Sequence, residues 1–359
     1  MPRFRKYLDV DVLTAARARI ERILDTHDTP VVLFSGGKDS LVVLHLTLDA
    51  VKRRGATQLD VVFRDEELLP DSVIDFVKSY FDRPDIRMVW SVVPTVNELF
   101  VLGKSSTYIQ WDPARSDRWV RKKPEWAFAG FDNTRVCDQH FMDGMIADLY
   151  PGKVALVNGI RADESLTRYR SCVNKLEDNY IVRSNSPKAS MCKPIFDWNE
   201  IDVFKFFYDT DIEYCPIYDA QVLSGGSLRV STPLHAESVK RIELLRSQDP
   251  SFYDRVTQIF PDSALNRYWS DLDTDTALAE YGTSFLNVRR WMRANLAPAN
   301  LAIAMQYFQD ILKMEAANPG LYHPVYLLKW AMSGACTRML TPQNKQQYAE
   351  MSAKYATEK

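Results

Sequence analysis

The sequence lacks the features that mark membrane-bound and secreted proteins. No apolar run approaches the ~20 residues that a membrane span requires. The first residues, MPRFRKYLDVDVL, contain no apolar stretch of the kind found in a secretion signal. Five cysteines at wide spacing in 359 residues argue against a disulfide framework. We therefore expect a cytoplasmic protein without a membrane anchor.

An excess of charge of one sign is also missing. Lys and Arg number 45 and Asp and Glu number 47, so no overall field attracts nucleic acid or anionic lipid. Apolar residues make up 46% of the chain and charged residues 26%, which is typical of a globular protein. We find no internal repeat and no low-complexity tract. The length suffices for one large domain or two ordinary ones.

Short apolar runs alternate with helical patterns through about the first 210 residues. The runs cover residues 30–34, 59–63, 86–93 and 153–157, and helical stretches cover 41–54, 72–81 and 138–149. This rhythm predicts a doubly wound parallel sheet, a Rossmann-like α/β fold, with ligands at the carboxyl ends of the strands. After about residue 231 only helical patterns remain. We therefore predict a nucleotide-binding domain at 1–225 and a helical C-terminal domain at 226–359.

A pair of glycines directly follows the first of these strands, in the run Ser35-Gly36-Gly37-Lys38-Asp39-Ser40. Gly36 and Gly37 let the backbone approach an anion closely, and the free amides at the start of the next helix favour negative charge. Lys38 adds a positive charge, and the two serines add hydroxyl donors. Asp39 could cap the helix or help to hold a metal. A turn without a ligand is the alternative, but this context favours a phosphate site.

The run SGGKDS resembles the phosphate loop of the N-type ATP pyrophosphatases, also called the PP-loop superfamily. The resemblance implies the adenine nucleotide α-hydrolase-like fold and Mg²⁺-dependent use of ATP. In that superfamily the loop holds the β,γ-pyrophosphate while a nucleophile attacks the α-phosphorus. Lys38 and Asp39 would then be catalytic residues.

Three further segments resemble the branch that contains the phosphoadenylyl-sulfate (PAPS) reductases and the sulfurylase small subunit. They are FRDEELLP at 63–70, GIRADES at 159–165, and KPIFDW at 193–198 followed by YCPIYD at 214–219. The resemblance implies that Arg161 is catalytic and that nucleotide contacts come from Asp65, Gly159, Glu164, Arg168 and Arg170. It also suggests that Asp39 and Asp65 hold the metal. The alternatives are a solvated loop at 65–66 and, at Asp197-Trp198, a helix N-cap beside a core aromatic.

The cysteines do not fit the best-known chemistry of that branch. A reductase needs a nucleophilic cysteine in an E-C-G-x-H motif near the C-terminus, and this sequence ends in EMSAKYATEK. The Cys-Cys pair and C-x-x-C of the iron–sulfur members are also missing, so we do not expect a cluster. Convergence of Cys137, Cys172, Cys192 and Cys215 in space stays an alternative.

The function that these observations favour is cleavage of ATP between its α- and β-phosphates to activate an acceptor. A sulfonucleotide reductase-like protein and a non-catalytic ATP-binding subunit are the alternatives. Residues 111–126, rich in Trp, Arg and Lys, suit either a nucleic acid or a protein-docking surface. The architecture also resembles reductase-like proteins of mobile elements and DNA sulfur-modification systems. That resemblance implies a protein partner or a homo-oligomer.

Overall fold

The computed structural model describes residues 8–101, 104–131, 136–172, 178–225, 228–235, 238–239, 242–268, 274–332, 336 and 338–356. Contacts divide the chain into two compact units. The first contains residues 1–96 and 109–230, and the second contains 97–108 and 231–359. The domains predicted from sequence, 1–225 and 226–359, assign the 97–108 segment differently and remain a prediction.

The first unit is built on a six-stranded sheet with the order β3-β2-β1-β6-β8-β7. Its parallel strands are β1 (Thr29–Phe34), β2 (Leu59–Arg64), β3 (Ile86–Ser91), β6 (Val154–Val157) and β8 (Ala189–Cys192). The short β7 (Ile181–Arg183) pairs antiparallel with β8 at one edge. The mostly parallel sheet confirms the predicted fold class.

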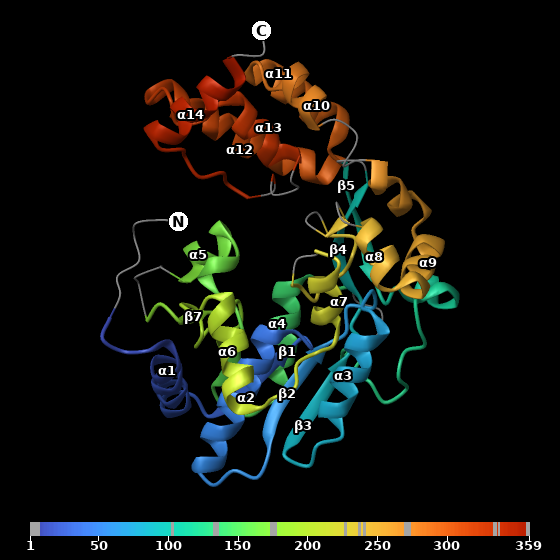
Figure 1. Cartoon of the computed structure of the whole chain (residues 1–359), viewed down its shortest axis with the longest axis vertical. Helices are drawn as coiled ribbons and strands as arrows, with labels where there is room; N and C mark the ends of the chain where they lie inside the picture. The colour runs from blue at the N-terminus through green and yellow to red at the C-terminus, as the bar shows by residue number, and fades with distance from the viewer. Residues whose placement is uncertain are drawn as a thin grey trace. The chain divides into compact units, whose positions relative to one another are not determined.

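Helices cover both faces of this sheet (Figure 1). Along β1, Val32 and Phe34 belong to a core shared with α1 (Val12–Thr26), α2 (Lys38–Arg53), α3 (Asp71–Phe81) and α6 (Glu200–Thr210). Val31 points to the other face and packs with residues of α4 (Gln139–Asp148). Because successive strand residues face opposite ways, a strand buried on both faces is apolar throughout.

The strand order reverses between β1 and β6. From β1 the chain passes through α2 to β2 and through α3 to β3, always moving outward on one side. Strand β6 then pairs with β1 on the other side, with Val31 opposite Leu156. In open α/β sheets, ligands bind in the crevice outside the carboxyl ends of the strands at such a reversal.

The second unit contains helices together with residues 97–108, which belong to a two-stranded hairpin. The hairpin strands are β4 (Thr95–Val101) and β5 (Lys104–Gln110). The helices are α8 (Ile242–Gln248), α9 (Pro250–Ile259), α10 (Thr274–Tyr281), α11 (Phe285–Asn295), α12 (Pro298–Ala317), α13 (Pro324–Met332) and α14 (Lys345–Ala356). Helices α10 to α14 gather around their own core, which includes Phe308 and Tyr322 (Figure 1). Within the described residues, no helix has the length and apolar character needed to span a bilayer.

Candidate active site at the strand reversal

The loop between β1 and α2 requires glycine at its first turn. Gly36 has φ +75°, in the left-handed region. A Cβ built there would lie 2.9 Å from Val77 Cγ2 and 3.0 Å from Val73 Cγ1, both on α3. Gly37 caps α2 without a side-chain hydrogen bond. The local sequence therefore brings the start of α2 close to the carboxyl end of β1.

The two predicted serine donors brace the loop itself. Ser40 Oγ donates to the Gly37 carbonyl at 2.9 Å and accepts from the Ser35 amide at 3.2 Å. The two hydroxyl oxygens lie 3.0 Å apart, and Ser35 Oγ accepts from the Gly37 amide at 3.3 Å. Both hydroxyls are thus engaged within the loop, which fixes its shape.

Lys38 is buried, with 3% of its surface exposed. Its ammonium donates to the Leu228 carbonyl at 2.7 Å. It also lies 3.4 Å from an Asp39 oxygen and 3.5 Å from a Glu200 oxygen. The Lys38 amide donates to the Tyr218 hydroxyl at 2.8 Å. The predicted phosphate-binding lysine is therefore already held by partners on both its backbone and its side chain.

Arg161 joins the second half of the site to this loop. Its guanidinium Nε donates to Asp39 Oδ1 at 2.6 Å, and the arginine is 3% exposed. Gly159, the second residue after the end of β6, packs directly on the start of α2. A Cβ on Gly159 would lie 2.5 Å from the Asp39 carbonyl carbon and 2.6 Å from the Ser40 amide nitrogen. The structure therefore brings Lys38, Asp39, Gly159 and Arg161 together across the β1/β6 reversal.

Glu164, in the same GIRADES segment, connects Arg161 to the helix that follows. Glu164 lies in the 3-10 helix η2 (Ala162–Glu164) and accepts from the Arg161 amide at 3.3 Å. The same carboxylate pairs with Arg168, on α5 (Leu166–Cys172). Arg170, on the same helix, is exposed. Glu164 thus links Arg161 to Arg168, while the predicted nucleotide contacts of these residues stay a prediction.

Asp65 lies in a separate buried cluster. Its carboxylate accepts from the Trp90 indole at 3.0 Å and from the Glu67 amide at 3.0 Å, and it pairs with Arg121. Glu67 is fully buried with φ +61° and pairs with both guanidinium nitrogens of Arg115 at 2.7 Å. Nucleotide or metal binding by Asp65, as predicted, requires this carboxylate to exchange at least one of these partners.

The same cluster changes the interpretation of residues 111–126. Trp111 is fully buried, and its amide donates to Glu67 at 2.6 Å. Arg115 and Arg121 are paired with Glu67 and Asp65, so much of the aromatic and basic pattern is used for internal packing. The exposed basic and aromatic members are Arg118, Lys122 and Trp126; the Arg118 side chain is 64% exposed and Trp126 58%.

All five cysteines are buried thiols. Burial raises the pKa of Cys192 to about 12 and the pKa values of Cys215 and Cys336 to about 11. A raised pKa lowers the thiolate fraction on which cysteine nucleophiles depend. In the part of the chain that the structure describes, no three His, Cys, Asp or Glu residues come together as a metal-binding group.

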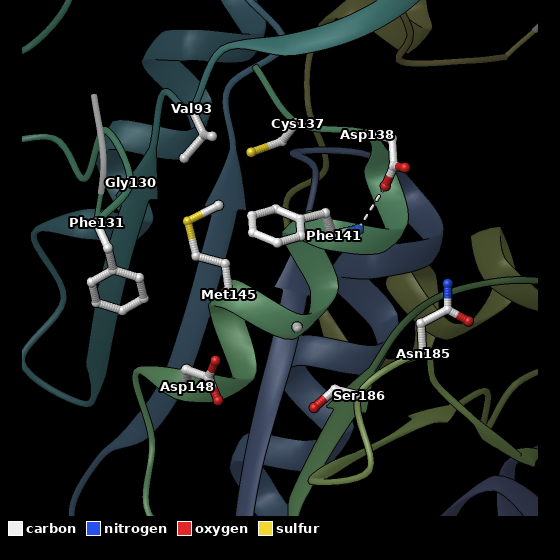
Figure 2. Close-up of a pocket in the computed structure, with 11 residues that line it drawn as sticks. Val93, Gly130, Phe131, Cys137, Asp138, Phe141, Met145, Asp148, Asn185 and Ser186 are labelled. Carbon is white, nitrogen blue, oxygen red and sulfur yellow. Dashed lines mark hydrogen bonds between the residues drawn. The ribbon is translucent and has the colours of Figure 1, made fainter. Parts of the chain in front are cut away.

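Two cavities among the described residues of the first unit are relevant to the site. One of about 110 Å³ adjoins the phosphate loop and is lined by Ser35, Arg64, Glu66, Leu69 and Val230, among others. The larger, of about 500 Å³, runs along α4 on the opposite face of the sheet from α2. Figure 2 shows Phe141 and Met145 lining it from α4, with Asn185 and Ser186 at its far side. Of these two cavities in the described residues, the smaller is the one lined by a residue of the loop, Ser35.

Sequence reasoning missed three residues that contact Lys38: Tyr218, Glu200 and Leu228. Tyr218 is contained in the YCPIYD segment, so its place in a family pattern was the available signal. For Glu200 and Leu228 the sequence offers none. In KPIFDW, Trp198 is a buried core aromatic as the alternative expected, but Asp197 is not the helix cap, because Asn199 caps α6 and Asp197 pairs with Arg19 on α1.

Comparison with known families agrees with this geometry. Residues 29–256 match the model of the phosphoadenosine phosphosulfate reductase domain, which covers more than half of the chain. The chain belongs to this family. That membership confirms the resemblance to the PP-loop superfamily that the motifs indicated.

The known proteins that match this chain have low sequence identity to it. YbdN of Escherichia coli K12, named as uncharacterized, is 28% identical over 239 residues, which cover 62% of this chain and 58% of YbdN. FMN adenylyltransferase of Candida glabrata, solved with FAD and inorganic pyrophosphate, is 17% identical with a TM-score of 0.39 and 58% coverage of both chains. PAPS reductase of Candida auris, solved with phosphate, is 12% identical with a TM-score of 0.34, covering 61% of this chain and 88% of its own.

Proposed function

We propose that this protein is an ATP pyrophosphatase of the adenylyl-transferring type, which cleaves ATP between its α- and β-phosphates to activate an acceptor. One observation carries the proposal. The glycine loop after β1 and the arginine after β6 meet at the strand reversal, where the Arg161 guanidinium and the Asp39 carboxylate lie 2.6 Å apart. A buried arginine and a buried lysine at a helix N-terminus place two positive charges where a polyphosphate can bind.

The roles of the residues follow from their charge and place. Lys38 and the amides at the start of α2 would hold the β- and γ-phosphates. Arg161 would neutralise charge on the α-phosphate as the acceptor attacks in line. Asp39 orients Arg161 and keeps it at the loop. Catalysis of this kind depends on positioning and charge neutralisation more than on a protein nucleophile.

Mg²⁺ fits this arrangement as a partner of ATP. Mg²⁺ usually keeps several waters and is held by one or two carboxylates together with substrate phosphates. Asp39 is the carboxylate at the loop, and we propose that it takes this role. Asp65 is a weaker candidate because its side chain is fully buried, whereas that of Asp39 is 17% exposed. When bound, the cation supplies charge neutralisation of the phosphates.

The acceptor and the partners belong to the same proposal. A nucleic acid or protein that docks on residues 111–126 would meet chiefly Arg118, Lys122 and Trp126, since Trp111, Arg115 and Arg121 are committed to the interior. We propose a protein partner or homo-oligomer and a cytoplasmic location on the sequence arguments given above.

The test is to incubate pure protein with Mg²⁺ and ATP labelled at the α- or γ-phosphate, and to separate the products. AMP with pyrophosphate, or an adenylylated acceptor, is the expected result, and Lys38→Ala should abolish it. ADP with phosphate would contradict the proposal. Binding of ATP without turnover under any acceptor would favour the second candidate, a non-catalytic ATP-binding subunit.

A sulfonucleotide reductase is the third candidate. It needs a reactive thiolate, and burial of all five cysteines, with the pKa raised for Cys192, Cys215 and Cys336, argues against these thiols in that role. Release of sulfite from PAPS by the pure protein with a thiol reductant would favour the reductase over our proposal.

A further inference from the structure

A short segment, residues 228–230, lies directly on the phosphate loop. The Leu228 carbonyl accepts from the Lys38 ammonium at 2.7 Å. Val230 lies over Gly37, with its Cβ 3.7 Å from where a Gly37 Cβ would be. Val230 also lines the 110 Å³ cavity together with Ser35. We call residues 228–230 the strap.

One side chain of α7 (Ile217–Leu223) holds the strap in place. The Gln221 amide nitrogen donates to the Arg229 carbonyl at 2.7 Å, and the Gln221 oxygen accepts from the Arg229 amide at 3.0 Å. Gln221 is buried, so water competes poorly for these two hydrogen bonds. Helix α7 also carries Tyr218, whose hydroxyl accepts from the Lys38 amide. A single helix therefore fixes both the strap and the start of α2.

The ammonium of Lys38 has three protons and three oxygen partners nearby: the Leu228 carbonyl, Asp39 and Glu200. Of these three oxygens, the Leu228 carbonyl is the one to which the ammonium donates a hydrogen bond, so a phosphate oxygen that approaches Nζ competes with that carbonyl for a proton. The carbonyl is the uncharged partner of the three. An anionic phosphate oxygen adds the attraction between opposite full charges, which a neutral carbonyl cannot supply, whereas exchange of a carboxylate would only replace one anion by another. Exchange of the Leu228 carbonyl for phosphate is therefore the favoured change.

We propose that bound phosphate displaces the strap from Lys38, and that the Gln221–Arg229 pair sets how firmly the strap is closed. This inference rests on the proposed function, since it assumes that polyphosphate binds at the loop. When a site must open before its ligand can bind, the apparent affinity equals the affinity of the open form multiplied by the fraction of molecules that are open. Loosening the strap should then tighten binding, although the altered residue touches neither loop nor ligand.

The direct test follows hydrogen exchange at the Arg229 amide, with ATP and inorganic pyrophosphate as ligands and calorimetry to confirm binding. The expected result is faster exchange at Arg229 when the site is saturated, the reverse of the protection that ligands ordinarily cause. Unchanged exchange at Arg229 with ATP bound would overturn the proposed displacement of the strap but leave the proposed function standing. If neither ligand binds, the proposed function falls, and the strap falls with it.

Gln221→Ala provides the second measurement. Loss of the two hydrogen bonds that Gln221 makes to Arg229 should tighten pyrophosphate binding by about fivefold or more. Gln58→Ala is the matched control, because Gln58 also donates to a backbone carbonyl, that of Pro84, beside the amino end of β2. It should leave binding unchanged. Weaker binding by a folded Gln221→Ala variant would contradict the proposal.

Discussion

Gly159 lies so close to the main chain at the start of α2 that a methyl group on this residue would not fit. The neighbours that a Cβ would meet are main-chain atoms of Asp39 and Ser40, at 2.5–2.6 Å, and they cannot move without shifting the start of α2. The spacing between Arg161 and the phosphate loop therefore depends on this glycine. Side-chain chemistry alone does not set it.

Gly159→Ala should accordingly damage both stability and the site. Overpacking of this kind costs about 1–3 kcal/mol, and we expect ATP affinity to fall by about tenfold or more, since a kilocalorie or two lost at the site corresponds to that change. Urea unfolding and calorimetry measure the two effects.

Gly144→Ala is the control for this substitution. Gly144 lies inside α4, and the nearest heavy atom to a new Cβ is Ser186 Cβ at 3.8 Å. Helix propensity predicts a gain of up to about 1 kcal/mol and no change in ATP binding. If Gly159→Ala behaves like Gly144→Ala, the close approach of the two segments is not what holds the site together.

At this residue scale the sequence revealed the loop but not its partners. Gly36 and Gly37 could be recognised as part of a phosphate loop because they are adjacent and follow an apolar strand. The contact between Lys38 and Tyr218 joins residues 180 positions apart, and no local pattern encodes it. Asp65 illustrates the opposite problem, since a carboxylate at a strand end fits a ligand site as well as the buried pair with Arg121 that the structure contains.

At the scale of elements, the segment 111–121 is attached to the acidic loop after β2 by buried ion pairs. Glu67 is fully buried, and Arg115 is its charged partner through two hydrogen bonds. Breaking a buried ion pair by removing one partner costs about 3–5 kcal/mol, because the other charge stays buried.

We therefore expect Arg115→Ala to lower the free energy of unfolding by about that amount. Arg118→Ala, three residues away with an exposed side chain, should change it by less than about 0.5 kcal/mol. Urea denaturation of the two variants side by side is the measurement. Equal stabilities would show that the Glu67 pair does not anchor the segment.

Helices α2 and α3 are joined by a histidine that the fold keeps neutral. His45 Nε2 lies 2.8 Å from the Tyr80 hydroxyl, and burial lowers the pKa of His45 to about 4. In the unfolded chain this ring takes up its proton near pH 6.5. Between these values the unfolded state binds more protons, so stability is complete above about pH 6.5 and declines as the pH falls toward 4.

This linkage predicts a loss on the order of 2 kcal/mol from wild type between pH 7.5 and 5. His45→Gln keeps a polar side chain at the position but removes the titration, so its stability should fall less over the same range. The comparison requires unfolding curves at several pH values. Parallel decline of the two proteins would mean that other groups account for the acid sensitivity.

At the scale of the whole molecule, the parallel sheet was predictable because its central strands are continuous apolar runs between helical patterns. Strand β8 was not, since its sequence, Ala-Ser-Met-Cys, has no β-branched residue and depends on pairing with β6. Strand β5 likewise was not among the strands predicted from the sequence, and within the described residues it pairs with β4 alone.

The central claim is that ATP is cut between its α- and β-phosphates at the loop that follows β1. Two ATP analogues test it most directly, one with a methylene group between the β- and γ-phosphates and one with a methylene group between the α- and β-phosphates. We predict that the protein releases AMP from the first and leaves the second intact, and that Lys38→Ala leaves both intact. Release of phosphate from the α,β-methylene analogue, with the β,γ-methylene analogue untouched, would contradict the account.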